Sequence, residues 1–75
     1  MQDDIFYVFE LQTNGAAGSV LTWTYSSLAE AESKFYLILS AAAVSLVPKH
    51  GAIILNGDGI MLKHEVFTHK LTEEN

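Results

Sequence analysis

The chain has 75 residues, 49% of them apolar, and a net charge of −5 from nine acidic residues and four lysines. A chain of this length forms one domain that buries only about 60% of its unfolded surface, and because cysteine is absent, disulfides and thiolate chemistry are excluded. Four of the acidic residues lie at the two ends of the chain (Asp3, Asp4, Glu73 and Glu74), so the rest of the chain is nearly neutral and lacks the dense acidic face of a DNA mimic. The absence of arginine argues against a nucleic-acid binder.

The first predicted element is a strand over residues 4–12, in which side chains alternate between two faces. One face carries Ile5, Tyr7, Phe9 and Leu11, and the other carries Phe6, Val8, Glu10 and Gln12. Because Phe6 and Val8 are apolar, we expect part of this second face to be covered too. Residues 13–18 predict a flexible loop, and residues 20–25 predict a second strand that completes a hairpin.

A single long helix is predicted over residues 28–47. Ser27 and Glu30 form a capping box at its start, and Pro48 ends it because proline disfavours the helical conformation of Val47. One apolar stripe has the spacing of a core-facing surface. It comprises Leu28, Ala31, Phe35, Ile38, Leu39, Ala42 and Leu46. A second apolar stripe lies nearly opposite and comprises Leu37, Ala41 and Val44.

The last part of the chain predicts two strands joined by a tight turn. Residues 51–55 are apolar, as in a buried strand, and Asn56-Gly57-Asp58-Gly59 is a strong turn signal. Residues 60–71 then predict a strand whose successive side chains point to opposite faces of the sheet. Which face is the core stays open, because a bulge near Lys63 would exchange the two faces.

The predicted order is therefore strand, strand, helix, strand, strand. It indicates an α+β fold in one domain, residues 1–75 with polar ends at 1–4 and 72–75, with a four-stranded, mainly antiparallel sheet and one helix across one face. No element of the chain covers the other sheet face. We therefore expect a homo-oligomer, most simply a dimer. The expected interface comprises Leu37, Ala41, Val44, Phe6 and Val8.

An alternative explanation of the second stripe needs no interface. An alanine-rich helix centre also reflects high helix propensity. Leu37 and Val44 would then be isolated apolar residues on the surface, which are common in soluble proteins.

The sequence favours a soluble, cytoplasmic protein. Its N-terminus lacks the pattern of a secretory signal, and the apolar stretch from Phe35 to Val47 is 13 residues long, too short to span a bilayer.

No motif indicates catalysis, a metal or a cofactor. His64 and His69 would point to opposite faces of a regular strand and cannot share one ion. The glycine-rich segment 56–59 joins two strands, whereas phosphate-binding loops lead into a helix. A small sheet with one helix also leaves little room for a cleft that excludes water, so we do not expect an enzyme.

A ligand could still bind where subunits meet, because twofold symmetry would double a small set of cationic and aromatic side chains. The candidates for binding a small anionic ligand are Lys34, Tyr36, Lys49, His50, Trp23 and Tyr25.

Several segments resemble a group of short phage and prophage proteins of gut bacteria. The similar segments are Tyr7-Val8-Phe9-Glu10 with Gln12, Asn14-Gly15, residues 30–36, residues 41–45, and Val47-Pro48-Lys49-His50. The group has Tyr-His where this chain has Phe35-Tyr36, so a role of that histidine is not carried over. The resemblance implies a viral setting and no particular chemistry.

Together these observations predict a non-catalytic binding protein. In a viral setting, it would be a phage accessory protein that counters a host process by binding a host protein or by sequestering a small anionic or nucleotide signal. The alternative is a structural or assembly component of the phage without a small-molecule ligand.

Overall fold

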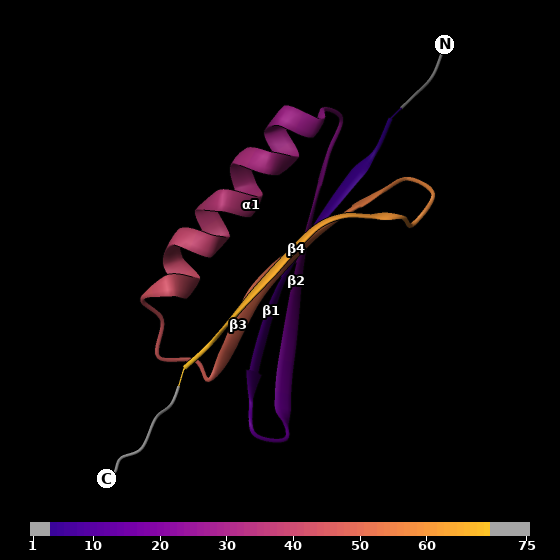
Figure 1. The fold of residues 1–75 in the computed structure, drawn as a ribbon. Helices are drawn as coiled ribbons and strands as arrows, with labels where there is room; N and C mark the ends of the chain where they lie inside the picture. The colour runs from indigo at the N-terminus through magenta and orange to yellow at the C-terminus, as the bar shows by residue number, and fades with distance from the viewer. Residues whose placement is uncertain (1–3, 70–75) are drawn as a thin grey trace, which may run out of the picture.

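The computed structural model describes residues 4–69, which form four strands and one helix (Figure 1). The elements in chain order are β1 (Phe6–Asn14), β2 (Ala17–Tyr25), α1 (Leu28–Ala43), β3 (Lys49–Asn56) and β4 (Met61–Thr68). The strands form one sheet in the order β2-β1-β3-β4, and each neighbouring pair is antiparallel. The predicted α+β fold is confirmed. Of the predicted polar ends, only residue 4 lies within the described part.

The β1–β2 hairpin is tighter and longer than predicted. Asn14 pairs with Ala17, so the loop of residues 13–18 is a turn at Gly15 and Ala16 flanked by paired strand residues. Gly15 has a φ of +65°, a conformation that glycine adopts without steric cost. This turn allows the two strands to stay paired over nine positions without a register shift.

The helix begins where predicted and ends about one turn early. The Ser27 side chain accepts a hydrogen bond from the Glu30 amide at 3.1 Å, which caps the first turn. At the other end, Val44 is no longer helical, and the Ser45 hydroxyl accepts a bond from the Val47 amide at 2.9 Å. This local bond competes with helix continuation. Leu46, predicted in the core stripe, consequently lies beyond the helix and is 82% exposed.

The core lies between α1 and one face of the sheet. The four buried helix residues all belong to the predicted core stripe: Ala31, Phe35, Ile38 and Ala42. Ala31, Phe35 and Ile38 pack with Val8 of β1 and with Ala52 and Ile54 of β3. In the same stripe, Leu39 is half-buried and Leu28 is 39% exposed.

The prediction of Phe6 and Val8 as residues of one exposed interface is wrong. Val8 is completely buried in the core, and Phe6 is half-buried against the core cluster on the same side of the sheet as α1. The cause is that α1 covers the face of β1 that also carries Glu10 and Gln12. The opposite face of the sheet is the one that α1 leaves uncovered (Figure 1).

The β3–β4 connection follows the predicted turn. The Asn56 side chain accepts hydrogen bonds from the amides of Asp58 and Ile60, both at 2.9 Å, and Gly59 has a φ of +83°. A bulge near Lys63, the possibility that the sequence leaves open, is present, because the register shifts between Ile54, opposite Lys63, and Leu55, opposite Met61. The bulge directs Lys63 to the helix side of the sheet and His64 to the other side.

Candidate functional site

The uncovered side of the sheet, which we call the open face, has an apolar centre. Side chains paired across neighbouring strands point to the same side of a sheet. The register therefore places a continuous group on β1 and β3, opposite the helix. This group comprises Tyr7, Phe9 and Leu11 of β1 and Ile53 and Leu55 of β3. All five are half-buried by their neighbours, and the Tyr7 and Phe9 rings stack with centroids 6.4 Å apart.

The edges of the open face mix polar and apolar side chains and are almost uncharged. Thr22 and Thr24 of β2 and His64 and Thr68 of β4 are exposed there, and the register adds Val20 of β2 and Met61 and Val66 of β4. Lys49 at one corner is the only lysine on this face within the described residues, and the register places no carboxylate there. An apolar centre bordered by polar side chains is the usual anatomy of a protein-binding surface, and here the apolar area also reaches both edges of the sheet.

The predicted helix stripe of Leu37, Ala41 and Val44 is exposed on α1. Leu37 is 63% exposed and Val44 is 82% exposed. Leu37 lines a hollow with Tyr25 of β2, so the stripe lies on the flank of α1 nearest β2. The structure thus places the stripe on the surface, and its role as an interface stays a prediction.

Three of the six predicted ligand-binding residues gather between β2 and α1. The Lys34 ammonium lies 3.9 Å from the centroid of the Trp23 ring, a cation–π contact. Tyr25 and Lys34 line a shallow hollow of about 390 Å³, whose wall also includes Glu30. Because Lys34 already contacts an aromatic ring and an acid stands beside it, this hollow is poorly suited to an anion.

Tyr36, a fourth candidate, lies on the other flank of α1. It contacts Lys63 of β4, whose ammonium is 5.8 Å from the Tyr36 ring centroid and 3.8 Å from a Glu32 carboxylate oxygen. A hydrogen bond with Tyr36 raises the pKa of Lys63 above its ordinary value of 10.5. Lys49 lies on the open face, so neither residue can join Lys34 in one site within a subunit.

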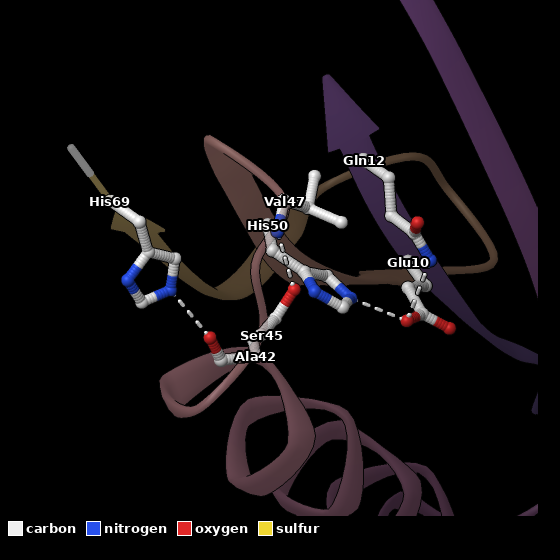
Figure 2. Close-up of polar contacts among 7 residues, drawn as sticks. All are labelled: Glu10, Gln12, Ala42, Ser45, Val47, His50 and His69. Carbon is white, nitrogen blue, oxygen red and sulfur yellow. Dashed lines mark hydrogen bonds and ion pairs between the residues drawn. The ribbon is translucent and has the colours of Figure 1, made fainter. Parts of the chain in front are cut away.

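His50 is buried in a pair with Glu10, 40 positions earlier in the chain. Nε2 of His50 lies 2.6 Å from Oε2 of Glu10, and the Gln12 amide donates to the same oxygen at 3.2 Å (Figure 2). The His50 and Glu10 side chains are only 7% and 14% exposed. The pair joins β1 to β3 beneath α1, which is a structural role and leaves no access for an anion.

Two other possibilities find no support in the described part of the chain. Residues 4–69 contain no cluster of three or more histidine and carboxylate side chains that could hold a metal ion. His69 instead places Nε2 2.8 Å from the Ala42 carbonyl oxygen at the end of α1 (Figure 2). No helix within the same residues is long and apolar enough to cross a membrane.

Comparison with protein-family models, with curated proteins and with solved structures gives no match to this chain. The sequence predicts that one face of the sheet is uncovered, but it assigns the interface to Phe6 and Val8, which lie on the other face. The apolar run from Ile53 to Leu55 was the available signal, because a strand covered on one side alone would alternate.

Proposed function

We propose that the chain is a non-catalytic, homo-oligomeric binding protein whose open face contacts a protein partner. The single observation that carries this proposal is the apolar centre of that face, which comprises Tyr7, Phe9, Leu11, Ile53 and Leu55. Contiguous exposed apolar surface of this kind usually marks a site of contact with another molecule.

The size of the open face is adequate for such a contact. Its strands are eight or nine residues long. At about 3.3 Å per residue and about 4.8 Å between strands, the sheet presents about 500 Å². With an equal contribution from the partner, the contact would bury about 1,000 Å², the lower limit for a specific interface.

A protein partner fits the geometry better than a small anionic ligand does. The predicted ligand-binding residues are divided among four places, and one of them, His50, is paired with Glu10. The open face has one lysine at its corner, so it offers apolar area and little positive charge. Of the two host targets expected from the sequence, we therefore propose a host protein over a nucleotide signal.

The setting of the proposed function follows from the resemblance to phage and prophage proteins. We propose that the chain is a phage accessory protein that acts in the cytoplasm of the host cell and counters a host process by covering part of a host protein. The alternative is a structural or assembly component of the phage, because an apolar face can equally lock a subunit into a larger particle.

The proposal is tested by a charged substitution in the centre of the open face. Tagged wild-type protein, Phe9→Lys and the control Ala43→Lys, exposed on α1 on the other side of the sheet, are each purified from phage-infected cells, and the co-purifying proteins are identified by mass spectrometry. We expect one host protein to be retained by wild type and Ala43→Lys and to be reduced at least tenfold with Phe9→Lys. Because Phe9 points away from the core, circular dichroism should show a folded variant.

Two results would count against this function. A host protein retained equally by Phe9→Lys would show that the open face is not the contact surface. Stoichiometric presence of the chain in purified virions, with no host protein retained, would favour the assembly component instead.

A further inference from the structure

The two edge strands of the sheet, β2 and β4, differ in how well they are protected against pairing with a strand of another molecule. β4 carries a bulge near its start and the charged residues Lys63 and Glu65. β2 contains neither charge nor proline, and it pairs with β1 over nine positions without a shift. Natural proteins protect exposed edges with charges, prolines or bulges, because an unprotected edge offers free backbone donors and acceptors to another strand. Among residues 4–69, nothing pairs with the outer edge of β2.

The position of α1 also leaves β2 accessible. The helix packs chiefly on β3 and β1 and least on β2. As a result, Leu21 on the helix side of β2 is 49% exposed, and Val20, on the uncovered open face, is 56% exposed. These are large apolar side chains in the middle of a strand whose backbone edge is also free within the described chain.

We infer that β2 pairs antiparallel with β2 of a second copy, about a twofold axis at Leu21. This inference specifies the self-association in the proposed function and rests on that part of it. The axis at Leu21, the middle residue of β2, pairs the whole strand with itself. The facing residues are then Leu21 with Leu21, Trp23 with Ser19, Tyr25 with Ala17, Val20 with Thr22, and Thr24 with Gly18.

The composition of β2 makes this pairing complementary. Each of the two aromatic side chains, Trp23 and Tyr25, faces a small residue of the second copy, Ser19 or Ala17. The only pair of like large residues is Leu21 with itself, an apolar contact that needs no polar partner. No charge faces another charge, so the like-charge repulsion that destabilises directly opposed residues does not arise.

The same pairing accounts for the helix stripe. Leu37 lies on the flank of α1 nearest β2, as the hollow that it shares with Tyr25 indicates, and Ala41 follows it by one turn on the same flank. A twofold axis at Leu21 places both helices on the same side of an eight-stranded sheet. The two stripes then face each other across the axis, so the exposed edge and the exposed stripe belong to one surface.

A charge exchange at the axis tests the inference. In sedimentation velocity, we expect wild type at twice the 8.2 kDa of one chain, because the strands pair. Leu21→Lys alone and Leu21→Glu alone should each fall to the mass of one chain, because like charges then meet at the axis. An equimolar mixture of the two variants should recover the doubled mass. The pairing would be overturned by a wild type with the mass of one chain, by a Leu21→Lys variant that keeps the doubled mass, or by a mixture that stays at the mass of one chain.

A cross-linking experiment covers the case in which charged variants fail to fold. The chain has no cysteine, so a single introduced thiol is unique. Leu21→Cys should form a covalent dimer on mild oxidation, whereas the control Thr24→Cys, on the same strand but far from its own copy, should not. Equal yields for the two variants would overturn the inference. If wild type is monomeric but retains a host protein that Phe9→Lys loses, only the pairing is overturned. If wild type is dimeric but Phe9→Lys retains the host protein equally well, only the proposed contact surface is overturned.

Discussion

Gly51 lies opposite Val66 at a point where β3 and β4 leave no room for a side chain. A Cβ atom at Gly51 would meet the Glu65 carbonyl oxygen and would lie 2.6 Å from Cγ2 and 2.8 Å from Cα of Val66. Two of these atoms belong to the backbone, so rotation of a side chain cannot relieve the clash. Glycine is therefore required here by the spacing between strands, and the Val66 side chain occupies the space above it on the open face.

We predict that Gly51→Ala lowers the free energy of unfolding by about 1–3 kcal/mol, the usual cost of forcing extra volume into a packed site. The measurement is urea denaturation followed by circular dichroism. Gly18→Ala is the matched control, because its Cβ would meet only the Gln12 carbonyl oxygen at 3.8 Å, an ordinary contact. Equal stability of the two variants would show that β3 and β4 separate without cost.

A second prediction at this scale concerns the helix cap. Ser27→Ala removes the acceptor of the Glu30 amide and should lower the free energy of unfolding by about 1 kcal/mol. The exposed neighbour Ser26 provides the control, since Ser26→Ala leaves that bond in place. An unchanged midpoint for Ser27→Ala in chemical denaturation would mean that water replaces the cap at no cost.

The buried pair of Glu10 and His50 explains why the covered face of β1 could not be identified from the sequence. Glu10 and Gln12 share a face with Phe6 and Val8, which made that face appear only partly covered. A carboxylate is tolerated under a helix when a partner satisfies it. The partner here is His50, which becomes adjacent only through the β1–β3 pairing, and that pairing is not visible in one sequence.

At the scale of elements, features that depend on neighbouring residues were predictable. The start of α1 at Leu28 follows from the Ser27 cap, and the turn at residues 56–59 follows from its asparagine and glycines. The end of α1 depends on a competition between helix propensity and the bond from the Val47 amide to Ser45, whose outcome is decided by about 1 kcal/mol. A difference of that size is not resolved by periodicity, which continued the apolar stripe to Leu46.

The helix stripe gives a prediction at this scale. Leu37→Glu combined with Val44→Glu places like charges on the flanks that face each other across the proposed axis. We expect light scattering to show a reduction toward the mass of one chain. The control carries the same number of charges away from the stripe, Ala29→Glu combined with Ala43→Glu, both exposed on α1, and should keep the wild-type mass. If the stripe variant also keeps that mass, the stripe takes no part in self-association.

At the scale of the whole molecule, the fold has two layers where a third would be needed to cover both sides of the sheet. The layer order and the helix crossover followed from the sequence of elements, and the structure confirms both. The strand order β2-β1-β3-β4 did not follow, because the hairpins can be placed beside each other in more than one way. The strand order determines which residues meet on the open face, so the candidate site became identifiable only with the fold.

The protected state of β4 has a consequence for how far assembly proceeds. A subunit with two free edges could add neighbours at both ends and grow into a fibre. Here Lys63, Glu65 and the bulge oppose the pairing of another strand with β4. When two identical β2 edges pair with each other, neither edge remains free for a further subunit. Such a symmetric contact closes on itself. The unequal edges thus permit a finite particle and disfavour open-ended polymerisation.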